Sequence, residues 1–458
     1  MQPVHFRGRQ MARRIILLLD GTWNDADVGP FDTNIVRLRE IIARSLDSSS
    51  SVTQSESPAA ENSTAKLVSG RTYQGQTEHL VFYERGVGIV PLLDRIKGGS
   101  FGDGLSGNIR RAYKFLSFYY EPGDQIFVFG FSRGAYTARS LVGYIGSAGL
   151  LKRECCTPDL ERKAWGYYRT DPNDRMPGIW VELTPFVHDR SAFRIECLGV
   201  FDTVGALGVP LPEFYRLNRE SYEFHNVELS STTNVNLHAL AVDEHRQPFA
   251  PAVWRKPKFK SFTTVTEQVW FAGSHADIGG GYIEEARRAN TNIKALDDIT
   301  LDWMLKRVVK YYPDFPFASR AWKALDPSWS SAPQHVSRTG VYKLMPLALR
   351  AIANRGLAAL GWREAIVGYD RHAESIGEMI HISVLERLGV AVDGKNVYAP
   401  YSLRAMLDVM QSTYDKNCKT GSPIRIVGWD GSILDPDLAD EASIAQKLIA
   451  VAKQKVST

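Results

Sequence analysis

The stretch that most constrains the fold of this chain is the pentapeptide Gly130-Phe131-Ser132-Arg133-Gly134. It follows a short apolar run, 126–129, typical of a buried strand, and it precedes a helical pattern over 135–146. A strand, a Gly-x-Ser-x-Gly turn and a helix together predict a nucleophile elbow, which holds a serine hydroxyl above the end of a sheet. Side chains two residues either side of the serine would collide with the strand and helix, so Gly130 and Gly134 support the turn.

The same pentapeptide has a simpler interpretation, a tight strand-to-helix turn whose serine caps the helix. The flanking strand and helix favour the catalytic interpretation.

A second glycine-rich stretch, Gly102-x-Gly104-x-x-Gly107, matches a dinucleotide fingerprint in form, but no strand precedes it. We therefore interpret residues 98–107 as a flexible loop and expect a helix to follow over 108–120.

Composition and charge are those of an ordinary globular enzyme, with 44% hydrophobic and 23% charged residues and a formal net charge of +4. The basic residues are scattered rather than in blocks, which argues against nucleic acid as a partner. Weak attraction to an anionic lipid surface stays open, so peripheral membrane contact is compatible with the sequence. No apolar run approaches the roughly 18 to 20 residues of a membrane span. No secretory pattern follows the basic residues 1–14. We expect synthesis in the cytoplasm, and export by a specialised secretion system stays open.

The four cysteines give no sign of a metal site or a disulfide framework. Cys155 and Cys156 are neighbours, and neither Cys197 nor Cys418 completes a metal-ligand spacing. Buried free thiols are the expected state. We predict no metal and no organic cofactor.

Strand-like runs alternate with helical patterns along the first two thirds of the chain. This alternation predicts a mostly parallel sheet flanked by helices, an α/β-hydrolase-like fold. We place the catalytic domain at 12–305 and a mainly helical accessory region at 306–458. Within the catalytic domain, the serine-rich segment 45–66 is predicted to be a disordered insertion. The aromatic-rich segment 152–190 is either a lid over the site or a set of helices packed on the sheet. The predicted strands are 15–19, 80–83, 126–129, 193–201, 237–242 and 267–271.

Apolar spacing in the accessory region indicates helices. Residues 344–360 are apolar with Arg350 and Arg355 interspersed, which predicts a basic amphipathic helix. Packing on a neighbouring domain is the favoured role of this helix, and contact with a membrane surface is the alternative. Residues 441–456 predict a final helix.

Three predicted strands end in a serine, an aspartate and a histidine, in the chain order Ser132, Asp202, His275. That is the order of an α/β-hydrolase triad. Ser132 would attack a carbonyl carbon, His275 would take its proton, and Asp202 would orient and stabilise the imidazolium. Asp243 and Asp277 are rivals for the acid. Asp277 lies two residues after His275 and is also suited to shaping the histidine loop.

A tetrahedral intermediate needs two backbone donors for its oxyanion. We expect one from Arg133, after the nucleophile, and one from Gly21 or Thr22, in the polar turn after the first strand. Asp20 in the same turn would either hold the elbow loop or lie near a metal. No His-Glu-x-x-His or comparable ligand set supports metal-assisted hydrolysis.

Taken together, these stretches resemble the α/β-hydrolases of the type VI secretion phospholipase effector group and their uncharacterised relatives. The resemblance runs from about Arg13 to about Trp303, and it implies esterase chemistry through a Ser-Asp-His triad, with phospholipid acyl esters as substrate. A weaker match at 380–384 extends it. The matching stretches are Leu19-Asp20-Gly21-Thr22-Trp23-Asn24, Gly123-Asp124, residues 130–139, Phe201-Asp202-Thr203-Val204-Gly205, residues 240–244 and residues 274–282.

Two other functions stay open at this stage. One is a non-catalytic scaffold of the same fold, against which the complete set of motifs argues. The other is an esterase that acts on small non-lipid esters, which would prefer short acyl chains and show no activation at a lipid interface. The substrate is thus a lipid or another ester, and the sequence identifies no protein partner.

Overall fold

The computed structural model describes most of the chain between Arg13 and Ser457. Of the insertion predicted over 45–66, Ser45 ends helix α1 and Lys66 begins strand β2, and the residues between them lie outside the described ranges. Thr22 also lies outside them. The described residues are 13–21, 33–45, 66–71, 78–86, 100–191, 193–205, 229–257, 263–282, 293–317, 322, 325–355, 364–391, 397–415 and 423–457.

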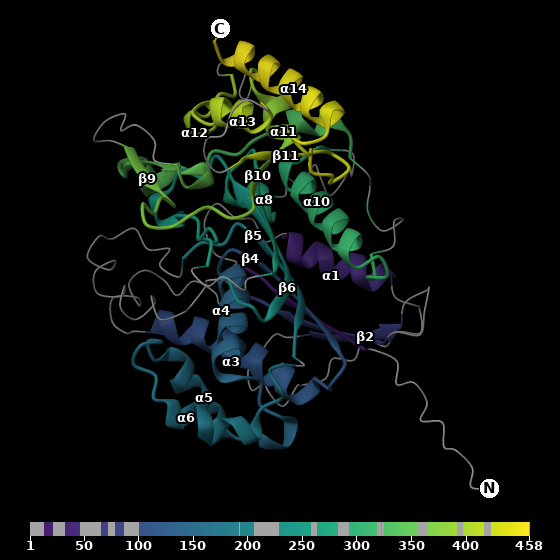
Figure 1. Ribbon diagram of the computed structural model, residues 1–458, viewed down its shortest axis with the longest axis vertical. Helices are drawn as coiled ribbons and strands as arrows, with labels where there is room; N and C mark the ends of the chain where they lie inside the picture. Colours follow the sequence, from purple (N-terminus) through teal and green to yellow (C-terminus); the bar gives the residue numbers. More distant parts are fainter. Residues whose placement is uncertain are drawn as a thin grey trace, which may run out of the picture.

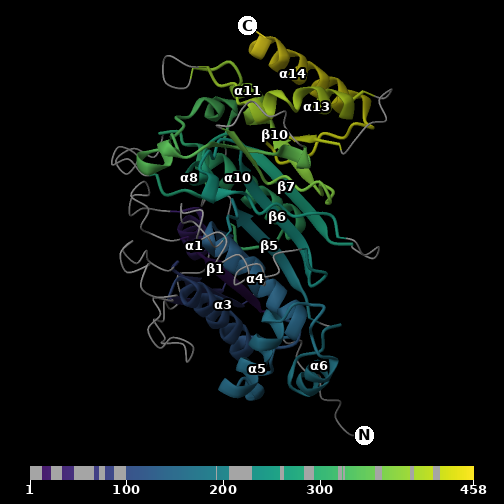
Figure 2. The same cartoon turned by 90° about the vertical axis from the view of Figure 1, so that its left-hand side faces the viewer.

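The described residues form a nine-stranded sheet in the order β11-β10-β7-β6-β5-β4-β1-β3-β2, with a separate pair β8-β9. Neighbouring strands run parallel except β2 and β3, which are antiparallel. The predicted α/β-hydrolase-like fold is confirmed (Figures 1 and 2). The strands are β1 (Arg14–Leu19), β2 (Lys66–Arg71), β3 (Glu78–Glu84), β4 (Gln125–Phe131), β5 (Ile195–Phe201), β6 (Thr233–Ala241), β7 (Val265–Phe271), β8 (Leu347–Arg350), β9 (Glu364–Val367), β10 (Glu378–His381) and β11 (Arg425–Val427).

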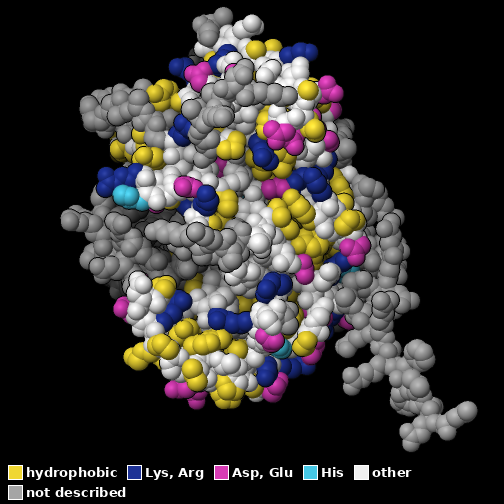
Figure 3. All heavy atoms as spheres, viewed as in Figure 1, with side chains coloured by type: hydrophobic (Ala, Val, Ile, Leu, Met, Phe, Trp, Pro, Cys, Tyr) yellow, Lys and Arg dark blue, Asp and Glu magenta, His cyan; other side chains and the backbone are white. Residues whose placement is uncertain are grey.

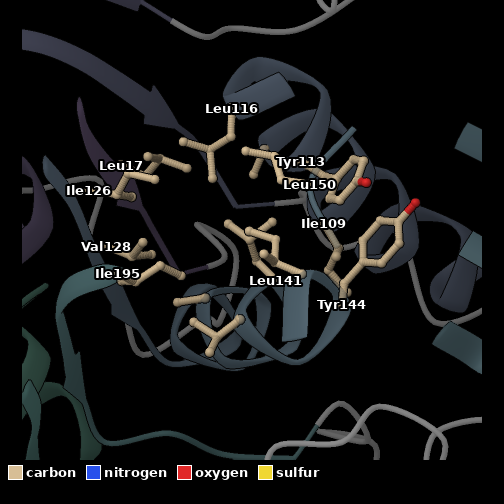
Figure 4. Packing of buried hydrophobic residues seen from close by; sticks show 14 of the residues in the cluster. Leu17, Ile109, Tyr113, Leu116, Ile126, Val128, Leu141, Tyr144, Leu150 and Ile195 are labelled. Carbon is tan, nitrogen blue, oxygen red and sulfur yellow. The ribbon is translucent and has the colours of Figure 1, made fainter. Parts of the chain in front are cut away.

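Helices cover both faces of the sheet because its strands are apolar on both sides. Successive side chains of a strand point to opposite faces, so Leu17 packs with α3 and α4, whereas Leu18 packs with α1 and α10. Figure 4 shows the first of these layers. The helices are α1 (Asn34–Ser45), α3 (Ser100–Tyr119), α4 (Arg133–Ala148), α5 (Pro158–Arg169), α6 (Pro177–Leu183), α8 (His275–Gly279), α10 (Leu296–Tyr311), α11 (Ile382–Arg387), α12 (Tyr401–Arg404), α13 (Leu407–Thr413) and α14 (Ala439–Ser457).

The loop predicted over 98–107 is wrong for residues 100–107, which form the first two turns of α3. Glycine lowers helix propensity by only about 1 kcal/mol per residue, and here the packing of the helix on the sheet outweighs that penalty. Ile109 and Leu116 of α3 are fully buried against the sheet. The formal dinucleotide fingerprint therefore lies inside a helix and carries no phosphate-binding loop.

The predicted boundary at 305/306 falls inside α10, and the C-terminal region contributes strands to the main sheet. Its helices α11, α13 and α14 are present, and α14 confirms the expected final helix. Strands β10 and β11 of the same region extend the main sheet beyond β7. The register pairs Ile380 with Trp270, and both side chains are fully buried. The region therefore completes the sheet of the catalytic domain.

The amphipathic helix predicted over 344–360 is wrong. Residues 347–350 form β8, and a short 3-10 turn, Ile352–Asn354, follows it. Residues 356–363 lie outside the described part of the chain. The apolar spacing reflects a strand whose residues are buried on both sides, since Ala348, Leu349 and Arg350 are all buried. Period alone does not separate such a strand from a buried helix.

The arrangement of residues 152–190 favours the interpretation as helices packed on the sheet over that as a lid. Helix α5 packs on α4, and its Trp165 and Tyr168 are buried in the same core as the sheet. In Figure 1, α5 and α6 lie at the end of the molecule away from α8, which carries His275.

On the face shown in Figure 3, acidic and basic side chains are interspersed with hydrophobic ones. Within the described residues, no helix combines the length and apolar character needed to cross a bilayer.

Candidate active site

Ser132 occupies a strained turn between β4 and α4. Its φ of 57° and ψ of −121° lie outside the regions that a non-glycine residue normally adopts. The two flanking glycines permit the turn. A Cβ on Gly130 would lie 2.6 Å from the carbonyl oxygen of Gly134, and one on Gly134 would lie 2.1 Å from the carbonyl oxygen of Leu19. The turn has the backbone of a nucleophile elbow.

Replacing Gly134 by alanine is expected to lower the free energy of unfolding by more than about 2 kcal/mol, because the added methyl group meets backbone atoms that cannot move independently. Chemical denaturation with circular dichroism measures the change. The control is Gly166→Ala in α5, where a Cβ would meet nothing within 4 Å. There the helix should gain a few tenths of a kcal/mol or more. Equal effects at both positions would contradict the steric argument.

The three residues predicted as a triad lie in one hydrogen-bonded chain. Ser132 Oγ is 2.7 Å from His275 Nε2, and His275 Nδ1 is 2.6 Å from Asp202 Oδ2. Ser132 is 7% exposed, His275 4% and Asp202 0%. This arrangement lets Ser132 donate its proton to Nε2 while Nδ1 donates to the carboxylate. Parallel order explains the meeting, because β4, β5 and β7 all end at the same edge of the sheet.

A fourth side chain, Arg350 of β8, binds the triad carboxylate. Its Nη1 lies 2.6 Å from Asp202 Oδ1 and its Nη2 lies 3.0 Å from Oδ2. Burial by itself would raise the pKa of Asp202, but the charge of Arg350 and the hydrogen bond from His275 outweigh it and hold that pKa well below its usual range. Asp202 is therefore ionised at neutral pH.

Sequence reasoning missed Arg350 because its pattern was assigned to the basic face of a helix. One signal could have pointed to it: an arginine among apolar residues that a buried strand would enclose needs an acidic partner. Nothing in the sequence names which carboxylate that is. Asp202 lies 148 residues earlier in the chain.

The histidine loop is held by carboxylates that are not the triad acid. Glu244 accepts a hydrogen bond from the backbone amide of His275 at 3.2 Å and pairs with the guanidinium of Arg246. Asp277 caps the start of α8 by accepting from the Ser274 amide at 2.8 Å. Asp277 thus shapes the loop, in agreement with the second role predicted for it.

Asp243, the other rival acid, is hydrogen-bonded to groups other than the histidine ring. Its Oδ2 accepts from the Gly273 amide at 2.7 Å and from the Tyr398 hydroxyl at 2.9 Å. Burial raises its pKa, and these hydrogen bonds offset part of the rise. Asp243 ties β6 to the turn after β7 and to the C-terminal region.

The predicted oxyanion donors lie beside Ser132. Arg133 is the first residue of α4, so its amide belongs to the helix turn whose N–H groups favour negative charge. Gly21 lies against the nucleophile, since a Cβ on it would be 3.2 Å from Ser132 Cβ. The Gly21 amide donates to Asp20 Oδ1 at 2.7 Å. Of the two donors predicted in this turn, Gly21 is therefore engaged, and Thr22 lies outside the described residues.

Asp20 holds the turn after β1. Its Oδ2 accepts from the hydroxyls of Thr33 and Tyr83, each at 2.8 Å. Burial raises the pKa of Asp20 to about 6, and the hydrogen bonds limit the rise. These contacts favour the first of the two predicted roles, support of the elbow loop.

We expect Asp20→Asn to make stability less dependent on pH. The folded pKa of about 6 exceeds the unfolded value of 3.8. Ionisation therefore costs more in the folded chain, and Asp20 lowers the free energy of unfolding as pH rises from about 4 to above 6. The variant should gain up to about 3 kcal/mol over wild type at pH 8 and nothing at pH 4. Urea unfolding at a series of pH values measures this. The exposed Asp159→Asn is the control, and a gain that does not vary with pH would contradict the argument.

Comparison with known proteins identifies the family. The model of the catalytic domain of Tle1-like phospholipase effectors of the type VI secretion system matches residues 13–307. The chain belongs to this family. An uncharacterised protein of Saccharomyces cerevisiae is 26% identical over 258 residues, which cover 52% of this chain and 32% of the yeast protein.

Two solved structures are similar to this chain at lower identity. The crystal structure of an uncharacterised protein from Pseudomonas aeruginosa has a TM-score of 0.35 and 16% identity, covering 69% of this chain and 48% of that one. The Tle1 effector bound to the VgrG spike of the type 6 secretion system has a TM-score of 0.28 and 18% identity, covering 60% and 52%. The chain spans about a third of the yeast relative and about half of each solved chain.

Proposed function

We propose that this Tle1-like protein is a serine hydrolase that cleaves the acyl esters of lipids, phospholipids foremost, through an acyl-enzyme. The observation that carries the proposal is the continuous hydrogen-bonded chain from Ser132 through His275 to Asp202, at 2.7 and 2.6 Å, set at a strained elbow. A scaffold does not need a serine in a costly backbone conformation beside a histidine. Family membership supports lipid esters as the substrate class.

The geometry supports a two-step reaction. Ser132 Oγ attacks the ester carbonyl carbon while its proton passes to His275 Nε2, and the Arg133 amide stabilises the resulting oxyanion. Thr22 is the remaining candidate for the second donor, because the Gly21 amide is bonded to Asp20. His275 then protonates the leaving alcohol. A water molecule attacks the acyl-Ser132 ester in the second step, with His275 again taking the proton. The Oγ–acyl bond then breaks, His275 returns the proton to Ser132 Oγ, and the fatty acid leaves. Asp202 stays ionised throughout and stabilises the imidazolium.

An apolar rim beside the site supports contact with a lipid surface. Leu344 is 90% exposed and Val336 is 74% exposed. Between them in sequence, Tyr342 packs edge to face with Phe249, whose ring contacts that of His275. Exposed apolar side chains next to a buried nucleophile suit insertion into a bilayer that holds the substrate.

Leu344→Ser should therefore reduce hydrolysis of phospholipid vesicles by about tenfold, because a buried leucine contributes roughly 1.5 to 3 kcal/mol. It should leave hydrolysis of a soluble short-chain ester unchanged. Initial rates on both substrates measure the ratio. Val181→Ser on α6, also at an exposed side chain, is the control. Equal losses on both substrates would assign Leu344 to the site itself instead of to the lipid surface.

Labelling with a fluorophosphonate probe followed by peptide mapping tests the proposed chemistry. Label on Ser132 supports an activated nucleophile, and a comparison of phospholipid vesicles with short-chain esters then separates a lipase from an esterase of small substrates. Folded protein that takes no label, with or without detergent, and hydrolyses neither substrate would favour the non-catalytic scaffold. Export through a type VI secretion system is a further expectation from the family, tested by detecting the chain outside cells with an active system.

A further inference from the structure

Arg350, the charge partner of Asp202, lies outside the residues that match the family model. Arg350 follows the matched residues 13–307 and belongs to β8. Its side chain is fully buried, as is that of Asp202. Its contacts cross several elements: besides both oxygens of Asp202, it donates to the carbonyl of Ala241 at 3.0 Å and to that of Phe249 at 2.7 Å.

These contacts fix the orientation of the carboxylate. Arg350 provides a planar fork that grips both oxygens of Asp202. The Ala241 amide donates to Oδ1 at 3.0 Å. Oδ1 is thus held by Arg350 and Ala241, which leaves Oδ2 directed at His275 Nδ1. A carboxylate gripped in this way cannot turn away from the imidazole between catalytic cycles.

The same contacts also change the charge that His275 faces. An isolated carboxylate beside a histidine favours the imidazolium by its full negative charge. Here the guanidinium of Arg350 balances the charge of Asp202, so the net charge of the Asp202–Arg350 pair is zero. The hydrogen bond between His275 and Asp202 still stabilises the imidazolium. The other charged side chains near His275 are themselves paired. Glu244 is paired with Arg246, and Asp277 contacts His335.

On the opposite side of Asp202, His238 Nε2 accepts the Thr203 amide at 3.2 Å. Burial and the nearby charge of Arg139 lower the pKa of His238, so its ring is neutral. Replacing Arg350 leaves each of these groups in place, although its charge also lowers the pKa of His238 and of Glu244. Arg350 is therefore the group whose removal alters the charge at Asp202.

We propose that Arg350 is a positioning residue of the active site, which aims Asp202 at His275 and balances the charge of that buried carboxylate. The inference rests on the proposed function, since it needs Ser132 and His275 to react. It also makes the C-terminal region a part of the catalytic site.

A purely structural role for Arg350 predicts a different outcome. Removing one partner of a buried ion pair costs stability wherever the pair lies. A matched pair exists away from the site: Arg307 of α10 grips Glu267 of β7, and both side chains are almost fully buried. Loss of stability without a change in catalysis is the expected result there.

The test compares Arg350→Lys and Arg350→Met with Arg307→Met in the full chain, using a soluble ester and recording kcat and KM across pH. In Arg350→Met, kcat should fall by about tenfold or more. The acid limb of kcat/KM should move up by about one pH unit, because the unbalanced carboxylate favours the imidazolium. Lysine keeps the charge and loses the fork, so Arg350→Lys should lower kcat several-fold with little movement of the limb. KM should stay unchanged in both, since Arg350 is buried beneath the site.

Arg307→Met should lose stability and keep the wild-type pH profile. Folded Arg350 variants with kcat within twofold of wild type and an unmoved acid limb would overturn the inference. If Arg350→Met does not fold, Arg350→Lys decides by its kcat alone. Wild-type protein that takes no fluorophosphonate label would instead overturn the proposed function, and the two failures are thereby distinguishable.

Discussion

Ser132→Ala is expected to reduce ester hydrolysis by about 10⁴- to 10⁶-fold and to abolish fluorophosphonate labelling. The variant removes the attacking oxygen, and the groups that surround it act as a unit, so loss of the nucleophile costs nearly as much as loss of the whole set. The fold should be kept. Among the described residues, the Ser132 hydroxyl donates its hydrogen bond to His275, and alanine fits the space that a serine leaves.

His275→Ala is the matched comparison for the nucleophile. It should give a loss of similar size, and the double variant should be no worse than either single one, because neither residue works without the other. Rates on a short-chain ester and on vesicles measure all three. Turnover that survives in Ser132→Ala, in protein of wild-type circular dichroism, would exclude the proposed chemistry.

Asp202→Asn is expected to lower kcat by about 10⁴-fold, because the amide leaves His275 in the wrong tautomer and without a charge to stabilise the imidazolium. Unlike Ser132→Ala, it should also destabilise the protein by about 3 to 5 kcal/mol, since Arg350 stays buried and loses its carboxylate. Steady-state kinetics and denaturant unfolding measure the two effects on the same preparation.

The double variant Asp202→Asn with Arg350→Met is the control for the second effect. Removing both charges should recover much of the lost stability while kcat stays low. A double variant that is as unstable as the sum of the two single ones would show that charge pairing is not the cause.

The N-terminal two thirds of the fold could be predicted because its strands and turns are local signals. Apolar runs such as 15–19 and 126–129 match β1 and β4, and turn residues follow each of them. Parallel order then brings the strand ends together, which is how Ser132, Asp202 and His275 could be named as one site before any coordinates. A triad needs each residue only at the correct end of its strand.

The C-terminal third could not be read in the same way, because its short strands depend on tertiary partners. Residues 347–350 and 378–381 are four-residue strands. The first pairs with the equally short β9, and the second pairs with β7, far away in sequence. The spacing of apolar residues in such short segments does not distinguish a strand from a helix. Arg350 was misassigned for this reason, since its role is defined by a carboxylate that only the folded sheet brings near.

Because Arg350 lies 148 residues after Asp202 in the chain, it is also synthesised later. Translation proceeds at about 5 to 20 residues per second, so the triad acid is made on the order of 10 to 30 s before its counter-ion. His275 is added about halfway through that interval, 73 residues after Asp202. From then on the ribosome-bound chain contains Ser132, Asp202 and His275 but lacks the group that neutralises the buried acid. The nascent chain therefore acquires a competent site only after Arg350 has been made.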